Sequence, residues 1–290
     1  MAGDDLPARA APQVPANVSF DAVTALSATP ADAQQAYGAA PVQRTETWYP
    51  RGMAAPAPVV LFLHGGCWLD AYGVDHARPL AAALRDAGFA VVAPEYRRVG
   101  DAGGGWPGTF ADIAAVLDAL ADDARLDLDR LAVVGHSAGG HLALWLGARA
   151  GLPADTVLPR AGAVTPEPAL VVGLAAIADL DTYARGDSSC ETVTPRLMGG
   201  MPEEVPERYA AASPQRLPPA AAPVVLIQGT LDSIVPAAQA HAYAARMNDA
   251  GGDVRIEWIE GAGHFDPIHP GTAAFARLLE VLRPLLGATS

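Results

Sequence analysis

The feature that most constrains this chain is a regular alternation between short apolar runs and longer helix-like stretches. Continuous apolar runs bounded by glycine and proline are typical of parallel strands that are buried on both faces. Strands that alternate with helices predict a mostly parallel sheet with right-handed crossovers and with helices on both of its faces. The predicted buried strands cover residues 59–63, 89–93, 131–134, 170–176, 224–227 and 254–259, and residues 42–49 alternate like an edge strand. The predicted helices cover residues 77–87, 109–124, 138–150, 237–249 and 272–286.

Two stretches depart from this alternation. Residues 1–41 are rich in Ala, Pro, Asp and Gln, which predicts a partly ordered N-terminal arm with a short helix near residues 30–39. A single domain is expected over residues 42–290. Within it, residues 179–219 contain no clear strand, but they contain several prolines and short helical pieces such as residues 206–212. An insertion of this length at the carboxyl end of a strand predicts a lid or a specificity element.

The charge balance narrows the possible partners. The chain has 19 Arg and no Lys against 32 Asp and Glu, which leaves a net charge of −13. Because polyanions are bound by clustered cations, we expect neither nucleic acid nor an anionic membrane surface as a partner. The N-terminus lacks the basic and apolar regions of a signal peptide, and the apolar run at residues 169–178 is too short to span a bilayer. These features predict a soluble cytoplasmic protein.

The most specific motif is Gly135-His136-Ser137-Ala138-Gly139, which stands between a predicted strand and a predicted helix. This G-x-S-x-G pattern in a strand–turn–helix context is typical of a nucleophile elbow. The glycines permit a tight turn that holds the hydroxyl of Ser137 clear of the backbone. The start of the helix adds partial positive charge, which favours negative charge that develops there. Ser137 is therefore the predicted nucleophile.

A second motif, Leu63-His64-Gly65-Gly66-Cys67-Trp68, ends another predicted strand. Its two glycines let backbone N–H groups approach a substrate oxygen. Together with the N–H of Ala138, the backbone of Gly66 and Cys67 is predicted to form an oxyanion hole. Cys67 is expected to contribute its backbone and not a nucleophilic thiol. Cys67 and Cys190 are both expected as free thiols, although one bridge between them is possible.

A serine nucleophile needs a base and an orienting carboxylate. His264 follows the last predicted strand in a glycine-rich loop and is the predicted base, with His269 as the alternative. Asp232 follows the strand at residues 224–227 and is the predicted acid; Asp179, Asp181 and Asp266 are the alternatives. The chain order Ser137, Asp232, His264 agrees with a hydrolase elbow. His76 and His241 are expected to face solvent.

These motifs resemble those of the α/β-hydrolase superfamily over residues 42–288. The resemblance implies the α/β-hydrolase fold, with a lid insertion after the sixth strand, and acyl hydrolysis with Ser137 as the nucleophile. The motif at residues 64–68 looks like that of the kynurenine formamidase (arylformamidase) and peptidase-like esterase branch, as do residues 94–97, 106–107 and 209–214. The hormone-sensitive-lipase-like branch shows a further glycine where this chain has Cys67-Trp68, which argues against that branch.

The sequence therefore predicts a serine hydrolase that cleaves a small-acyl carboxylic ester or an aryl formamide through an acyl-enzyme intermediate. An acyltransferase or cyclase could use the same three residues, and an inactive hydrolase fold used as a binding partner is the third possibility. Trp68, Trp106 and His136 are candidates for the substrate pocket, and Glu95 and Arg97 are expected to form an ion pair that supports the loop at residues 64–68. No Cys/His cluster has metal-ligand spacing, so neither a metal nor another cofactor is expected. The expected partner is a small-molecule ester or amide, and the oligomeric state is left open.

Overall fold

The computed structural model of the chain describes residues 15–53, 56–162, 165–188 and 190–287. Its centre is one eight-stranded sheet in the order β1-β2-β4-β3-β5-β6-β7-β8. The first two pairings, β1 with β2 and β2 with β4, are antiparallel, and the remaining pairings are parallel. The strands are β1 (Ala33–Ala36), β2 (Arg44–Trp48), β3 (Ala57–Leu63), β4 (Ala90–Pro94), β5 (Leu126–His136), β6 (Leu170–Leu174), β7 (Val224–Gly229) and β8 (Val254–Ile259). The predicted mostly parallel sheet is confirmed.

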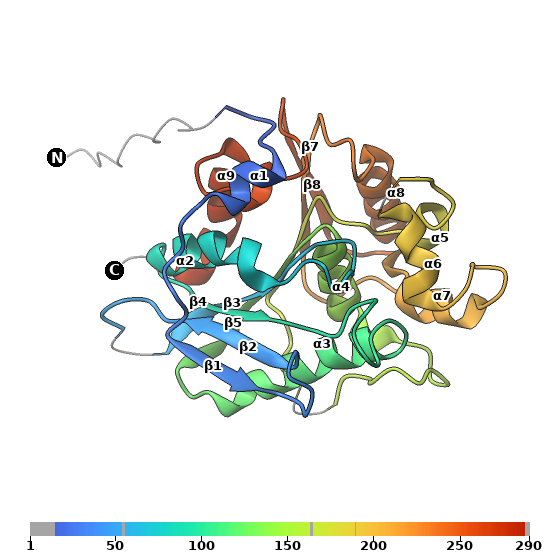
Figure 1. Cartoon of the computed structure of the whole chain (residues 1–290), viewed down its shortest axis with the longest axis horizontal. Helices are drawn as coiled ribbons and strands as arrows, with labels where there is room; N and C mark the ends of the chain where they lie inside the picture. Colours follow the sequence, from blue (N-terminus) through green and yellow to red (C-terminus); the bar gives the residue numbers. More distant parts are fainter. Residues whose placement is uncertain (1–14, 54–55, 163–164, 189, 288–290) are drawn as a thin grey trace.

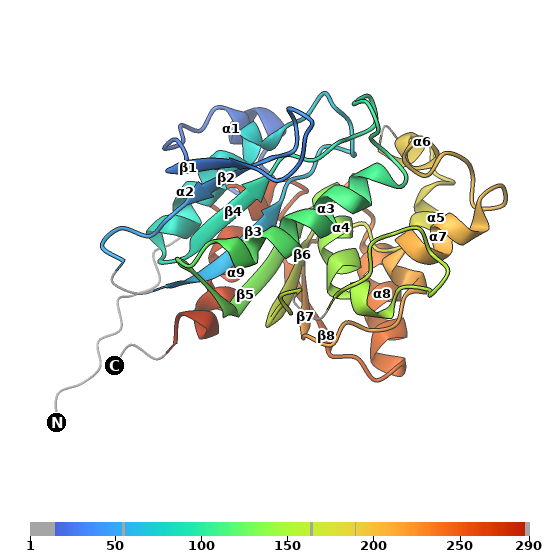
Figure 2. The same cartoon turned by 90° about the horizontal axis from the view of Figure 1, so that it is seen from below.

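Helices cover both faces of the sheet, as the alternation predicts (Figure 1). One face carries α1, α2 and α9, and the other carries α3, α4 and α8, an arrangement that is also visible from below (Figure 2). Their bounds are α1 (Phe20–Thr24), α2 (Arg78–Asp86), α3 (Gly108–Ala119), α4 (Ala138–Gly147), α8 (Ala237–Asp249) and α9 (Ala273–Leu282). Five of the six lie within or overlap the predicted helices, and α1 is the exception.

Strand β3 shows why both layers are needed. Successive side chains of a strand point to opposite faces of the sheet. Val59, Leu61 and Leu63 accordingly pack in the cluster that includes α3 and α4, whereas Val60 and Phe62 pack in the cluster that includes α2 and α9. All seven residues of β3 are buried, which explains the continuous apolar run in the sequence.

The N-terminal arm corrects two predictions. Residues 30–39 do not form a helix; Ala33–Ala36 is a strand that pairs with β2, with Gln34 opposite Glu46. The pairing overrides the modest helix preference of Ala and Gln, because the sheet offers hydrogen-bond partners that the sequence alone does not reveal. Strand β2 is consequently covered by β1 and is not at the edge. The described part of the arm belongs to the domain, and residues 1–14 lie outside the described residues.

The predicted insertion lies between β6 and β7. It contains α5 (Leu180–Tyr183), α6 (Thr194–Met198) and α7 (Pro206–Ala212), which gather beside α4 and α8 (Figure 1). Leu197, Met198 and Tyr209 are fully buried in the same core cluster as α3 and α4. The insertion is therefore packed into the molecule and continues its core.

Candidate active site

Ser137 occupies the turn between β5 and α4, at the carboxyl edge of the sheet. Its backbone has φ 56° and ψ −117°, a conformation that non-glycine residues rarely adopt. The turn is held from both sides, because the N–H of Ser137 donates to Leu174 O at 2.8 Å and Ser137 O accepts from His141 N at 3.0 Å. Strained backbone of this kind persists where the surrounding structure enforces it, as often happens at functional sites.

The glycines on either side of Ser137 are required because other backbone atoms leave no space for a Cβ atom at these positions. A Cβ atom on Gly139 would lie 2.1 Å from Leu63 O, and one on Gly135 would lie 2.0 Å from Gly139 O. The first contact brings the start of α4 against the end of β3, and the second closes the turn itself. The pattern in the sequence thus reflects two distinct packing requirements.

Asp232 and His264 meet behind this turn. Asp232 follows β7 and His264 follows β8, and His264 Nδ1 lies 2.9 Å from Asp232 Oδ2. The other carboxylate oxygen accepts the N–H groups of Ile234 and Val235, both at 2.9 Å. Burial alone would raise the pKa of Asp232, but the hydrogen bond and charge of His264, together with these N–H groups, hold it below its usual range. The carboxyl group is thus kept ionised beside the imidazole.

The alternative acids and the alternative base are engaged elsewhere. Asp179 caps α5 by accepting from the N–H groups of Asp181 and Thr182, and Asp181 itself pairs with Arg216. Asp266 accepts hydrogen bonds from backbone N–H groups. His269 Nδ1 accepts from Gly271 N at 3.1 Å. Of the predicted acids, Asp232 is the one that the structure pairs with His264.

Ser137 and His264 both line a cavity of about 190 Å³. His136 also lines it, and its Nε2 lies 2.9 Å from His264 O, while burial lowers the pKa of His136 well below its ordinary range.

Trp68 does not line this cavity, because its side chain is fully buried in the core and packs edge-on against His141. Trp106 packs against Phe110 and is also absent from the lining. Sequence reasoning missed Phe20, Tyr72, His76, Cys190, Ile234 and Phe265, which do line it.

The loop after β3 faces the same cavity. Gly66 and Cys67 have φ of 111° and 53°, so the backbone turns sharply here. In the part of the chain that the structure describes, neither of their N–H groups donates a hydrogen bond. Ala138 is the first residue of α4, and an N–H at that position has no partner within its helix. These three donors have no protein partner among the described residues that would compete with a substrate oxygen.

The support of this loop corrects another prediction. Glu95 does not pair with Arg97, whose guanidinium pairs with Asp112. The Glu95 carboxylate instead lies 3.0 Å from Arg98 Nη1, 3.5 Å from His64 Nε2 and 2.7 Å from Val74 N. Burial alone would raise the pKa of Glu95, but the His64 ring, the Val74 N–H and Arg98 lower it to about 2. Glu95 and Arg97 therefore have different partners, and Glu95 is the one that supports the loop.

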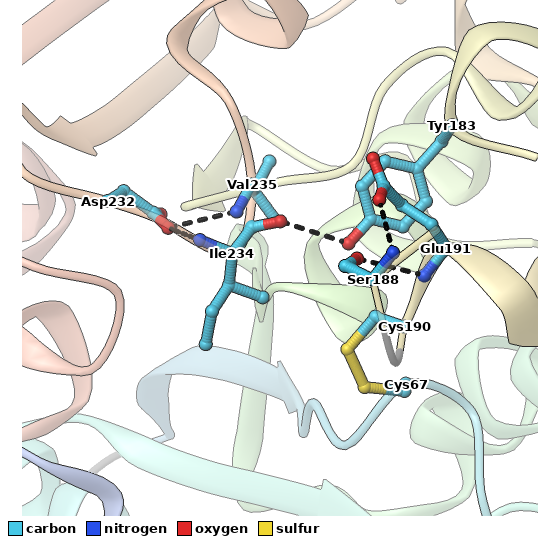
Figure 3. The surroundings of a disulfide bond; sticks show 8 residues. All are labelled: Cys67, Tyr183, Ser188, Cys190, Glu191, Asp232, Ile234 and Val235. Atoms are coloured by element: carbon cyan, nitrogen blue, oxygen red, sulfur yellow. Dashed lines mark hydrogen bonds between the residues drawn. A yellow bond between two sulfur atoms is a disulfide. The ribbon is translucent and has the colours of Figure 1, made fainter. Parts of the chain in front are cut away.

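The cysteines are joined, so the expectation of two free thiols is wrong. Cys67 and Cys190 form a disulfide with their Cα atoms 4.9 Å apart, although 123 residues separate them in the sequence. The loop after β3 and the insertion after β6 meet at one edge of the sheet, which brings the two together (Figure 3). Disulfides are typical of proteins in oxidising surroundings, whereas the cytoplasmic location expected from the sequence would keep both thiols reduced.

The insertion that carries Cys190 also contacts the loop that carries the acid. Ser188 N donates to the Glu191 carboxylate beside Cys190, and the hydroxyl of Tyr183 donates to Ile234 O at 3.2 Å (Figure 3). Because Ile234 N donates to Asp232, the insertion touches both the Gly66–Cys67 loop and the loop that carries the acid.

His76 does not face solvent as expected. It is 7% exposed, and burial lowers its pKa to about 3, so its ring is neutral at neutral pH. His241 is exposed, as predicted. His76 follows the loop from β3, and its burial arises from rings that the fold brings over it.

Comparison with known proteins gives the family. Residues 46–247 match the model of the BD-FAE family. The chain belongs to the BD-FAE family. This BD-FAE protein is 29% identical over 242 residues to esterase LipC of Mycobacterium tuberculosis, covering 79% of the chain and 58% of LipC. It is 29% identical over 204 residues to esterase LipQ of the same organism, covering 67% of the chain and 47% of LipQ. The chain thus spans about half the length of these curated relatives.

Solved structures show that this BD-FAE protein has the α/β-hydrolase fold. Esterase B from Lactobacillus rhamnosis has a TM-score of 0.76 at 23% identity, over 92% of this chain and 89% of that one. A truncated carbohydrate esterase from gut microbiota has a TM-score of 0.72 at 20% identity, over 88% and 97%. The thermophilic esterase Est2 from Thermogutta terrifontis has a TM-score of 0.69 at 19% identity, over 89% and 94%.

Among the described residues, no group of His, Cys, Asp and Glu side chains is arranged to hold a metal ion. Within the same residues, no helix has both the length and the apolar character needed to cross a bilayer.

Proposed function

We propose that this protein is a serine hydrolase that cleaves a small-acyl carboxylic ester or an aryl formamide through an acyl-enzyme intermediate. The observation that carries the proposal is that Ser137, in its strained turn, lines one cavity with His264, whose ring is hydrogen-bonded to Asp232. The esterase names of the relatives support the same reaction class.

In this mechanism the Ser137 hydroxyl oxygen attacks the substrate carbonyl carbon while His264 Nε2 takes its proton. The protonated imidazole then gives that proton to the leaving alcohol or amine, and the acyl group stays on Ser137. Water, deprotonated by His264, then attacks the acyl carbon, and the imidazolium returns that proton to the Ser137 oxygen as the acid is released. Asp232 accepts a hydrogen bond from Nδ1–H of His264 and stabilises the imidazolium. The lowered pKa of Asp232 keeps its carboxylate charged for this role.

The tetrahedral intermediate carries negative charge on the former carbonyl oxygen. We assign its stabilisation to the N–H groups of Ala138, Gly66 and Cys67. The three donors belong to the turn and to the loop that border the cavity, and preorganised donors of this kind act most strongly where water is excluded. The loss of one such donor typically costs about 10²–10³ in rate.

The size of the cavity favours a small acyl group. A volume of about 190 Å³, shared between the acyl and leaving groups, is filled better by a short acyl group than by a long alkyl chain. Formyl is the smallest acyl group, so aryl formamides belong in the substrate set together with acetyl and butyryl esters. Esters with ten or more carbons in the acyl chain should be cleaved much more slowly.

A substrate panel and a covalent probe test the proposal together. Turnover of p-nitrophenyl acetate, butyrate, decanoate and palmitate and of N-formylkynurenine is measured for the wild type, Ser137→Ala and the exposed control Ser27→Ala. Intact-mass analysis after treatment with a fluorophosphonate locates the nucleophile. We expect labelling at Ser137, a rate loss of up to about 10⁶ in Ser137→Ala, and no loss in the control. Ser137→Ala that retains more than a few per cent of the activity would contradict the assignment.

The acid and base are tested against their alternatives. His264→Ala should lower the rate nearly as much as the serine change does. Asp232→Asn should lower kcat about 10⁴-fold, because the imidazole loses its orienting partner. Asp179→Asn and His269→Gln are the matched controls and should retain activity. A fully active Asp232→Asn enzyme with an inactive Asp179→Asn enzyme would move the acid to Asp179.

A further inference from the structure

The N-terminal segment reaches the candidate active site from outside the region that matches the family. The BD-FAE match begins at residue 46, yet Phe20, the first residue of α1, lines the cavity beside Ser137 and His264. Phe20 is half-buried, while Val18 and Val23 on either side of it are buried in the core. This segment therefore supplies a wall of the cavity that the matched family region does not encode.

Asp266 fixes this segment next to the proposed base. Its Oδ1 accepts from Asn17 N at 2.8 Å, and its Oδ2 accepts from Val18 N at 3.0 Å and from Gly263 N at 3.1 Å. Asp266 is only 1% exposed, and its hydrogen bonds to Val18 and Gly263 are buried. One carboxylate thus ties the backbone before Phe20 to the backbone before His264.

The ring of Phe20 completes an aromatic wall. Its centroid lies 5.3 Å from Phe265, 5.5 Å from His76 and 5.9 Å from Tyr72, all within the range of favourable ring contacts. All four rings line the cavity. His76 is neutral at neutral pH, so none of the four carries a charge there. A wall of this kind favours a flat, apolar group.

The aromatic wall lies beside the proposed base. Phe265 contacts both the His264 ring, at 5.0 Å, and the Phe20 ring. In the proposed mechanism His264 hands a proton to the leaving group, which must therefore lie next to His264 and within reach of this wall.

We infer that Phe20 is a specificity-determining residue that packs on the aromatic leaving group of the substrate, and that Asp266 is its positioning residue. This inference rests on the proposed hydrolase function. It goes beyond that function because it assigns the preference for an aryl over an alkyl leaving group to a segment outside the family match.

The test compares phenyl acetate with ethyl acetate, which share an acyl group and differ in the leaving group. The two kcat/KM values are measured by pH-stat for the wild type, Phe20→Ala, Phe20→Leu and Trp258→Ala, which removes an exposed aromatic ring outside the cavity. Comparing the phenyl-to-ethyl ratio between variants cancels the different intrinsic reactivities of the two esters. We expect the ratio to fall about 3- to 10-fold in Phe20→Ala, by less in Phe20→Leu, and not at all in Trp258→Ala.

The outcomes separate this inference from the proposed function. A proportional loss on both esters leaves the ratio unchanged and would overturn the role of Phe20 while the hydrolase proposal stands. If Phe20→Ala does not fold, as judged by its melting curve, the ratio in Phe20→Leu decides. Asp266→Asn should lower the ratio in the same direction as Phe20→Ala, and an unchanged ratio would remove Asp266 from the positioning role. Hydrolysis of neither ester by the wild type, with Ser137 unlabelled by the phosphonate, would overturn both proposals.

Discussion

Two short segments border the same cavity but are held in place by different kinds of interaction. The Ser137 turn is held by backbone, through hydrogen bonds to Leu174 and His141 and through the close approach of Gly139 to Leu63. The loop that contains Gly66 and Cys67 is held by distant side chains. Tyr96 donates to His64 O at 2.8 Å, Glu95 lies beside the His64 ring, and a disulfide reaches the insertion after β6.

This difference has a consequence for stability and for function. A turn held by backbone contacts forms with the sheet, so damage to it should damage the fold. A loop held by remote side chains can lose its supports while the sheet stays folded. Damage to this loop should therefore reduce activity even in a protein that still folds.

The largest effect is expected at Gly139. Gly139→Ala places a Cβ atom 2.1 Å from Leu63 O, so the backbone of β3 or of α4 must move. We expect a loss of at least about 3 kcal/mol in the free energy of unfolding and complete loss of turnover, measured by urea denaturation and by ester hydrolysis. Gly162→Ala is the control, because among the described residues its Cβ would meet no atom nearer than 3.9 Å. A stable and active Gly139→Ala enzyme would show that the turn is not held as described.

Removal of the disulfide should affect the other segment. In a Cys67→Ser, Cys190→Ser double variant the insertion no longer fixes the loop, and a constraint across 123 residues is lost from the unfolded chain. We expect the free energy of unfolding to fall by about 2–5 kcal/mol. The kcat should fall by at least about 10-fold, since the donors of Gly66 and Cys67 lose their preorganisation. Wild-type enzyme treated with dithiothreitol should show the same decrease in kcat, and an unchanged kcat in both would contradict the dependence of the loop on the insertion.

Glu95 offers a milder test of the same loop. Glu95→Gln keeps the shape of the side chain but removes the charge between Arg98 and His64. We expect about a 3- to 10-fold loss of kcat and a cost of about 1–3 kcal/mol in stability, measured by steady-state kinetics and urea denaturation. Asp101→Asn is the matched control, because Asp101 is the second acidic partner of Arg98 and, among the described residues, its carboxylate has no hydrogen bond to the loop. Equal losses of kcat in the two variants would show that the lost activity comes from a change at Arg98 and not from the lost support of the loop.

The smallest effect on activity is expected in the last test, which concerns the pH dependence of stability. His141 contacts both the Ser137 turn and the loop after β3. Its backbone N–H donates to Ser137 O, and its ring packs edge-on against Trp68. Burial lowers the pKa of His141 from 6.5 to about 4, although its hydrogen bond to Ala212 O opposes the shift. Between these pH values the unfolded chain binds a proton that the folded chain does not, so acidification destabilises the fold by about 1.4 kcal/mol per pH unit for this group.

His141→Gln should therefore flatten the fall in the free energy of unfolding between pH 6.5 and pH 4, measured by urea denaturation at several pH values. His241→Gln, at an exposed histidine, should leave the slope unchanged. An equal slope in His141→Gln and wild type would mean that the folded protein protonates His141 as readily as the unfolded chain does.

The amino-acid sequence alone determined the features that depend on local periodicity and on residue type. Continuous apolar runs located the buried strands, and helix α8 has the bounds that the pattern predicts. The Ser137 turn could be identified because the glycines that the turn requires lie two positions before and two positions after the serine. Asp232 and His264 could be proposed because each follows a strand, and the carboxyl ends of parallel strands meet at one edge of the sheet.

Only the tertiary structure decided which distant residues share a surface. The pairing of β1 with β2 joins segments that are close in the chain, but it depends on a sheet that the local pattern does not show. The Cys67–Cys190 bond, the contact of Glu95 with His64 and the burial of Trp68 depend on contacts between segments far apart in the chain. The same is true of Phe20, which reaches the cavity because Asp266, almost 250 residues later, accepts two hydrogen bonds from the backbone just before it. Sequence patterns record the surroundings of a residue along the chain, whereas these features are set by hydrogen bonds, packing and a covalent bond that form only when the sheet brings its loops together.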